Sequence, residues 1–259
     1  MTASLSLSNE INLILVGATG KLGKSISKNN IVTYGICSKK NPFLGDVIEG
    51  IQKPLISSFS EVNLEIVDKP LVIDASYPEN LENILEFCFS YSIPLILAST
   101  GHTEKQLKKL EKLAKKVPVL KAPNLSVGIA FFKANMLKPI ISEINFRIDR
   151  KLATSELDIK IIETHHKNKK DSPSGTALDL KDYIQKGLES LNIEIEIESI
   201  RDKSSVGKHE VIFKIKNEEF SVSHNALSRD IFGEGISLAS HIIDKKSGIY
   251  SVSDLIADI

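Results

Sequence analysis

The sequence predicts an α/β protein made of a parallel sheet and an inserted α+β part that is built on a mixed or antiparallel sheet. In the first half of the chain, short apolar runs alternate with helical patterns, as expected for strands joined by crossover helices. From residue 157 onward, apolar and polar residues alternate, which is typical of half-buried strands. The 259 residues suffice for one large domain or two modest ones.

The first predicted strand covers residues 11–16 and ends in a glycine-rich turn, after which a helix is expected from Lys24. Glycines at 17, 20 and 23 permit a tight turn and let the backbone approach a pyrophosphate at the start of the helix. This context favours a Rossmann-type dinucleotide-binding domain, with a structural glycine turn as the alternative. The expected cofactor contacts are Gly17, Ala18, Thr19, Gly20, Lys21 and Leu22.

The second predicted strand, residues 31–37, bears on the choice of nucleotide. The strand is followed by Ser38, Lys39 and Lys40, where a site for NAD would place an Asp or Glu on the ribose hydroxyls. Hydroxyl and ammonium groups suit a 2′-phosphate, so the sequence favours NADPH, with NADH as an alternative cofactor. A solvated loop is the competing interpretation.

Three further strands are predicted at residues 71–74, 94–98 and 117–122, with helices at 81–90 and 103–115. Ligands of parallel sheets bind beyond the carboxyl ends of the strands, so the loops after the last two strands are expected to contact the cofactor. The residues concerned are Ala98, Ser99, Thr100, Pro123, Asn124, Leu125 and Ser126.

The second half is predicted to contain helices and a different sheet. The expected helices cover residues 127–142, a segment after Thr176, and 231–244; the expected strands cover 157–164, 194–200, 209–215, 220–224 and 248–252. The strands at 209–215 and 220–224 should form a hairpin that turns at 216–219. His209 and His224 lie in predicted strands, where a single histidine is more often structural, so no function is predicted for them.

The segment 163–176 concentrates chemical groups at the end of one of these strands. It contains His165, His166 and Lys169, followed by a helix start at residues 172–176. Histidine can change its charge near neutral pH, lysine is a fixed cation, and free N–H groups at a helix start favour anions. The pattern indicates a site that binds an anion and delivers a proton, whereas Lys167 and Lys170 are expected to be solvated.

This segment resembles the signature of the 4-hydroxy-tetrahydrodipicolinate (dihydrodipicolinate) reductase family, Glu-x-His-His-x-x-Lys-x-Asp-x-Pro-Ser-Gly-Thr-Ala. The resemblance extends to the glycine turn and to segments 74–78, 98–101, 122–126 and 226–229, the last ending in Arg229. The chain departs from the family at Ala75, where an aromatic residue is usual, and at Ala98-Ser99, where Gly-Thr is usual.

The resemblance implies reduction of 4-hydroxy-tetrahydrodipicolinate to tetrahydrodipicolinate with NAD(P)H in diaminopimelate and lysine biosynthesis. His165 and Lys169 would then be catalytic, and His166, Lys169, Gly175 and Thr176 would hold the dicarboxylate substrate. A homotetramer is implied, as are a dinucleotide domain at 1–125 and 231–259 and a substrate-binding and oligomerisation domain at 126–230. The alternatives are a dinucleotide-sensing protein without catalysis and another nicotinamide-dependent dehydrogenase of amino-acid metabolism.

Composition excludes several other classes of function. The 33 basic residues equal the 33 acidic ones, so no net positive charge favours nucleic acid or an anionic membrane. Cys37 and Cys88 lack the spacing of a metal site, so no metal is expected. Both cysteines are expected to be reduced thiols. No apolar run is long enough to cross a bilayer, and a cytoplasmic location is expected.

Overall fold

The computed structural model describes residues 11–151 and 156–256, and the chain divides into two compact units. Unit 1 combines the chain up to Val127 with the segment from Asp230 onward, and unit 2 comprises Gly128–Arg229. Within the described ranges, no helix is both long and apolar enough to cross a membrane.

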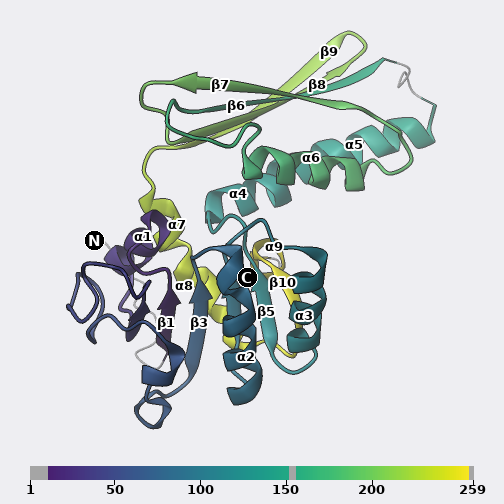
Figure 1. Cartoon of the computed structure of the whole chain (residues 1–259). Helices are drawn as coiled ribbons and strands as arrows, with labels where there is room; N and C mark the ends of the chain where they lie inside the picture. The colour runs from purple at the N-terminus through teal and green to yellow at the C-terminus, as the bar shows by residue number, and fades with distance from the viewer. Residues whose placement is uncertain (1–10, 152–155, 257–259) are drawn as a thin grey trace, which may run out of the picture. The chain divides into compact units, whose positions relative to one another are not determined.

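Unit 1 contains a six-stranded parallel sheet with the strand order β10-β5-β4-β3-β1-β2 (Figure 1). The strands are β1 (Asn12–Val16), β2 (Tyr34–Ile36), β3 (Pro70–Asp74), β4 (Leu95–Leu97), β5 (Pro118–Lys121) and β10 (Gly248–Ser251). The C-terminal strand β10 pairs in parallel with β5, so the chain returns to this sheet after unit 2. The predicted parallel sheet is therefore confirmed.

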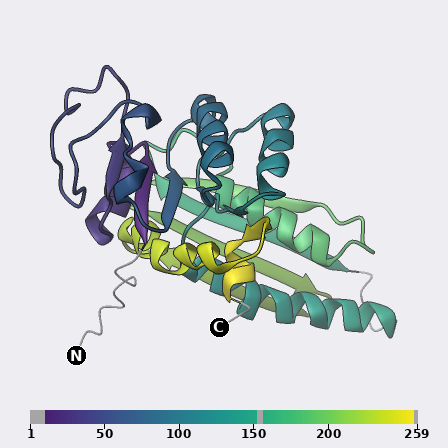
Figure 2. The same cartoon turned by 90° about the horizontal axis from the view of Figure 1, so that it is seen from below.

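Helices cover both faces of this sheet, because most of its strands are apolar on both sides. The helices are α1 (Lys21–Asn29), α2 (Leu81–Tyr91), α3 (Glu104–Ala114), α7 (Asp230–Glu234), α8 (Ile236–Ala239), a 3-10 segment at Ser240–Asp244, and α9 (Val252–Ile256). Figure 2 shows α2 and α3 on one face and the C-terminal helical segments on the other. Ile14, Val72 and Leu95 lie in the same apolar cluster as the buried side chains of α2 and α3.

Several boundaries differ from the sequence prediction. Helix α1 begins at Lys21, directly after the glycine turn, and β2 is limited to Tyr34–Ile36. The single helix predicted at 231–244 is wrong, because the segment divides into α7, α8 and the 3-10 turn. Its glycines serve close packing: a Cβ at Gly233 would lie 2.1 Å from the carbonyl oxygen of Ser25. A Cβ at Gly235 would lie 1.9 Å from that of Leu125.

Unit 2 contains a four-stranded mixed sheet with the order β7-β6-β8-β9. The strands are β6 (Leu157–His166), β7 (Ile195–Asp202), β8 (Gly207–Ile215) and β9 (Glu218–Ala226). Strands β6 and β7 are parallel, whereas β8 is antiparallel to β6 and to β9. The hairpin turns within two residues, 216–217, which is tighter than predicted, and Lys216 takes a φ of +54°.

Two long helices, α5 (Lys138–Asp149) and α6 (Gly175–Gly187), lie along one face of the mixed sheet (Figure 1). Ile141 of α5 and Leu180 and Ile184 of α6 share a buried apolar cluster with every second residue of the strands. Helix α5 follows α4 (Val127–Phe131) and a π-helical segment, Phe132–Leu137. The helical region therefore ends at Asp149 rather than at residue 142, as predicted from the sequence.

Candidate active site

The glycine turn after β1 has the tight geometry that its sequence predicts. Gly17 has a φ of +83°, and a Cβ there would lie 2.5 Å from the carbonyl oxygen of Ala75. A Cβ at Gly23 would lie 2.2 Å from the carbonyl oxygen of Gly17. Gly20 is the N-cap of α1, so no N-cap side chain accepts a hydrogen bond from the first N–H groups of this helix. This glycine-lined turn fits the pyrophosphate of a dinucleotide.

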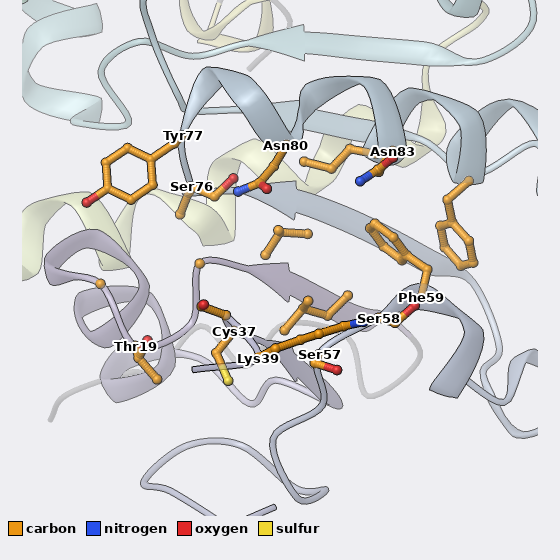
Figure 3. Close-up of a pocket in the computed structure, with 18 of the residues that line it drawn as sticks. Thr19, Cys37, Lys39, Ser57, Ser58, Phe59, Ser76, Tyr77, Asn80 and Asn83 are labelled. Carbon is orange, nitrogen blue, oxygen red and sulfur yellow. The ribbon is translucent and has the colours of Figure 1, made fainter. Parts of the chain in front are cut away.

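A pocket extends from this turn between two groups of residues (Figure 3). Thr19, Lys39 and the segment 57–59 lie on one side, and Ser76 and Tyr77 lie on the other. The pocket lining includes six residues predicted to contact the cofactor, namely Gly17, Thr19, Gly20, Lys21, Ser38 and Lys39. The pocket is thus continuous from the glycine turn to the end of β2.

The remaining predicted cofactor contacts are not part of this lining. Ala18 is fully buried, and Ala98 to Thr100 and Pro123 to Ser126 follow β4 and β5 at the carboxyl edge of the same sheet. Several residues that line the pocket were not predicted, because they lie outside any motif: Asn41, Ser57, Ser58, Ser60, Asn80 and Asn83.

A buried carboxylate connects the pocket to the loop after β4. Asp74, at the end of β3, is inaccessible to solvent and accepts hydrogen bonds from the backbone N–H of Ser76 at 2.9 Å and from its hydroxyl at 2.5 Å. Its second oxygen accepts a hydrogen bond from the Ser99 hydroxyl at 2.5 Å. The Ser99 hydroxyl lies 3.1 Å from Nε2 of His102. Asp74 therefore fixes the two loops relative to each other.

In unit 2, the sheet face that packs against α5 and α6 turns from apolar to polar at one end. At the apolar end, Ile161 on β6 pairs with Ile197 on β7 and with Val211 on β8. Two residues further along, the row across the four strands consists of Ser199, Glu163, His209 and His224. The next row contains Arg201, His165, Gly207 and Ala226. The strand alternation therefore gathers the titratable groups on one face.

Glu163 lies at the centre of this polar group and is inaccessible to solvent. One carboxylate oxygen pairs with Nδ1 of His165, and the other lies 2.9 Å from the Arg201 guanidinium. Burial acts to raise the pKa of Glu163, but the interactions with Ser199, Arg201 and His165 outweigh it and hold the pKa below its usual range. Glu163 is therefore an anion at neutral pH.

The two buried histidines beside Glu163 are held in their neutral form. Burial lowers the pKa of His165; Glu163 opposes this effect, and Lys169 and Arg201 add to it. Burial also lowers the pKa of His209 to about 3, and His165 contributes to the shift. The His165 and His209 rings lie edge to face with centroids 5.2 Å apart, and Nε2 of His209 lies 3.3 Å from the Ser174 hydroxyl.

Other predicted substrate-binding residues adjoin this polar group. His166, which was predicted to bind substrate, lies with Nε2 2.7 Å from the guanidinium of Arg229. Lys169 pairs with Asp171 at 2.8 Å and is half-buried, whereas Lys167 and Lys170 are exposed.

The start of α6 follows directly in the chain. The hydroxyl of Ser174 caps the helix by accepting a hydrogen bond from the N–H of Ala177 at 3.1 Å. Gly175 is exposed, and a Cβ there would meet nothing within 4 Å. Thr176 follows it in the first turn.

Glu163, His165 and His209 each offer one possible metal-ligand atom, and these atoms lie within 4.8 Å of one another. Their proximity does not require a metal ion. The carboxylate already has two partners, and the cations Arg201 and Lys169 beside it oppose a further positive charge. The absence of a metal stays a prediction from the sequence.

Glu163, Arg201 and His209 were not predicted to have a role in the site. The alternation along β6 does place Glu163 and His165 on one face, which was a local signal. Arg201 and His209 come from other strands, so their proximity depends on a register that a single segment does not reveal.

Family models match most of the chain. The model of the N-terminal part of dihydrodipicolinate reductases matches residues 11–125, and the model of their C-terminal part matches residues 140–256.

Individual relatives agree with these matches. A 4-hydroxy-tetrahydrodipicolinate reductase from Caldanaerobacter subterraneus subsp. tengcongensis is 34% identical over 95% of this chain and 98% of its own length. One from Buchnera aphidicola subsp. Schizaphis graminum is 32% identical over 95% of this chain and 97% of its own length.

A solved structure has the same fold. The dihydrodipicolinate reductase from Paenisporosarcina sp. TG-14, determined with dipicolinate bound, aligns with a TM-score of 0.72 and 20% identity. The alignment covers 95% of this chain and 99% of that one. The two family models and the full-length relatives show that the chain belongs to the 4-hydroxy-tetrahydrodipicolinate reductase family.

Proposed function

We propose that the protein reduces 4-hydroxy-tetrahydrodipicolinate to tetrahydrodipicolinate with NAD(P)H, in diaminopimelate and lysine biosynthesis. Membership of the family favours this reaction over dinucleotide sensing and over other nicotinamide-dependent dehydrogenases. The observation that carries the proposal is the buried pair of Glu163 and His165 beside Lys169, which provides a proton donor next to a fixed cation.

The bound nicotinamide supplies the hydride, and His165 supplies the proton that must accompany it. Without ligand, burial holds His165 neutral at pH 7. A dianionic substrate beside the ring reverses this preference, because a nearby negative charge stabilises the imidazolium. His165 then takes up a proton when substrate binds and releases it as the reaction proceeds.

Lys169, His166, Gly175 and Thr176 hold the two carboxylates of the substrate in this proposal. Lys169 exchanges the exposed carboxylate of Asp171 for that of the substrate, while the first N–H groups of α6 offer hydrogen bonds. Dipicolinate, the dicarboxylate bound to the related Paenisporosarcina enzyme, is a suitable probe of this site. In our proposal, unit 2 is the substrate-binding domain and unit 1 the dinucleotide-binding domain.

Two variants test the assignment, with NADPH oxidation and dipicolinate binding as separate readouts. His165→Gln should lower kcat by about a hundredfold or more and leave the dipicolinate Kd within a few fold. Lys169→Ala should lower kcat similarly and also weaken dipicolinate binding at least tenfold. Lys170→Ala is the matched control, because Lys170 is an exposed lysine of the same loop. Near-normal turnover of folded His165→Gln would remove His165 from the chemistry.

We further propose that NADPH is the preferred cofactor. Ser38, Lys39 and Asn41 line the pocket at the end of β2, where hydroxyl, ammonium and amide groups can hold a 2′-phosphate. Lys39→Ala should raise KM for NADPH about tenfold and change KM for NADH little, whereas the exposed Lys53→Ala should change neither. A wild-type kcat/KM that strongly favours NADH would contradict this preference.

A homotetramer formed through unit 2 and a cytoplasmic location complete the proposal. The sheet face opposite α5 and α6 carries Ile162 and Ile212, which are only half-buried within the chain, among paired charges such as Lys160 with Glu198. Cys37 and Cys88 are free and buried, as expected for a reducing compartment. Light scattering after size exclusion gives the mass directly, and a monomer or dimer would contradict the tetramer.

A further inference from the structure

Glu163 is a buried carboxylate whose two oxygens contact two different side chains. Oε2 pairs with Nδ1 of His165 on the same strand, and Oε1 lies 2.9 Å from Arg201 on the neighbouring strand. An ionised carboxylate can only accept hydrogen bonds, so the proton of the His165 pair lies on Nδ1.

We propose that Glu163 and Arg201 are positioning residues that hold His165 with Nδ1 protonated, so that Nε2 is the atom that exchanges a proton with the substrate. This inference rests on the proposed function of His165. Arg201 acts through the carboxylate: it fixes the direction of Glu163 and compensates its charge, which would otherwise be costly to bury. Glu163 in turn fixes the ring orientation and the tautomer of His165.

Gly207 keeps space open on the other side of the ring. It lies opposite His165 on β8, and a Cβ built there would be 3.0 Å from Nε2 and 3.4 Å from Cδ2 of His165. The backbone of Gly207 does not have a positive φ, so conformation does not require glycine here. The missing side chain instead leaves Nε2 unobstructed, which is the condition for proton exchange at that atom.

The charges around His165 determine how its proton affinity responds to substitution. The groups that act on it or respond to it are Glu163 on the same strand, Arg201 and Asp202 on β7, His209 on β8, and Lys169 in the following loop. Glu163 favours the imidazolium, and the cations Lys169 and Arg201 oppose it. Removing the charge of Glu163 should therefore make His165 harder to protonate.

The first test is Glu163→Gln in the full chain, with Glu143→Gln as the matched control. Glu143 is an exposed carboxylate on α5 of the same unit and pairs with Arg147 at 2.9 Å. Glu163→Gln should lower kcat tenfold to a hundredfold and shift the activity optimum to lower pH, because less imidazolium is present at pH 7. The NADPH Kd should stay within twofold, and Glu143→Gln should resemble wild type. A uniform loss of kcat at all pH values would overturn the positioning role.

A second measurement does not depend on turnover. Solid-state NMR of protein carrying ¹⁵N-labelled histidine reports which ring nitrogen is protonated, and His165→Gln assigns the His165 signal. Wild type should show His165 protonated at Nδ1, and Glu163→Gln should show a mixture of tautomers. Protonation at Nε2 in the wild type would overturn the inference. Normal turnover of His165→Gln would instead contradict the proposed function, so the two failures are distinguishable.

Gly207→Ala provides a variant that leaves every charge in place, in case Glu163→Gln does not fold. Its methyl group should obstruct Nε2 and lower kcat at least tenfold, with an unchanged NADPH Kd and an unchanged pH optimum. A Gly207→Ala enzyme with wild-type kcat would show that Nε2 needs no such space and would overturn the assignment.

Discussion

The glycine turn after β1 permits a test in which backbone strain and close packing are separated. Gly17→Ala combines a φ of +83° with a Cβ only 2.5 Å from the carbonyl oxygen of Ala75. Gly45→Ala has the strain alone, since its φ is +88° and a Cβ would meet nothing within 4 Å. Gly23→Ala has the close contact alone, with a Cβ 2.2 Å from the carbonyl oxygen of Gly17 and no positive φ.

The magnitudes follow from these differences. A side chain in the left-handed region costs about 1–2 kcal/mol, and reduced freedom of the unfolded chain offsets about 0.4–1 kcal/mol of this. Gly45→Ala should therefore lower the free energy of unfolding by about 1 kcal/mol. Gly17→Ala must also displace backbone atoms, at a further cost of about 1–3 kcal/mol, so its loss should be about 2–4 kcal/mol.

Urea denaturation measures these losses, and the fluorescence change of NADPH on binding measures its Kd. Gly17→Ala and Gly23→Ala should weaken NADPH binding at least tenfold, because both displace the turn that is proposed to hold the pyrophosphate. Gly45→Ala should leave the Kd unchanged. Equal stability losses for Gly17→Ala and Gly45→Ala, or wild-type NADPH affinity in Gly17→Ala, would refute the reasoning.

Two further predictions concern buried polar groups. Asp74→Asn replaces a buried carboxyl group that accepts hydrogen bonds from Ser76 and Ser99, and should cost about 2 kcal/mol in urea denaturation, against about 1 kcal/mol for Ser99→Ala; an unchanged transition would contradict the network. The pKa of His209 falls from 6.5 to about 3 on burial. The unfolded chain therefore binds a proton that the folded protein excludes, so this contribution to stability is complete above pH 6.5 and declines as the pH falls toward 3. Between pH 7 and 4 the wild type should lose on the order of 3 kcal/mol more free energy of unfolding than His209→Asn. An unaltered pH dependence would show that the pKa of His209 is the same in the folded and the unfolded chain.

Local patterns predicted much of unit 1 because its signals lie within short segments. The apolar runs of β1 and β3 are buried on both faces, and Gly20 and Gly23 avoid backbone atoms of the glycine turn itself. The division of 231–244 could not be predicted in this way. Gly233 and Gly235 avoid backbone atoms of Ser25 and Leu125, more than 100 residues earlier in the chain.

The candidate site in unit 2 was predicted only where its residues are consecutive. His165, His166 and Lys169 belong to one segment, and residue type was enough to suggest proton transfer and anion binding. The pairing of Glu163 with Arg201 depends on the parallel register of β6 and β7, and the contact of His165 with Gly207 depends on β8. The sequence of a strand shows which of its side chains share a face, but it does not show which strands pair with it or in which register.

The strand register that aligns the apolar core of unit 2 also aligns the residues of its candidate site. The stability of the core therefore supports the geometry of the site. Ile161 and Val211 pair within the apolar rows, and Glu163 and His209 form the next pair on the same face. A slip of one residue between β6 and β8 would move both apolar and titratable side chains to the opposite face. The burial of Ile161, Val211 and Phe213 therefore opposes any register that would expose Glu163, so the apolar rows stabilise the alignment of His165 with Arg201 and Gly207 without contacting substrate.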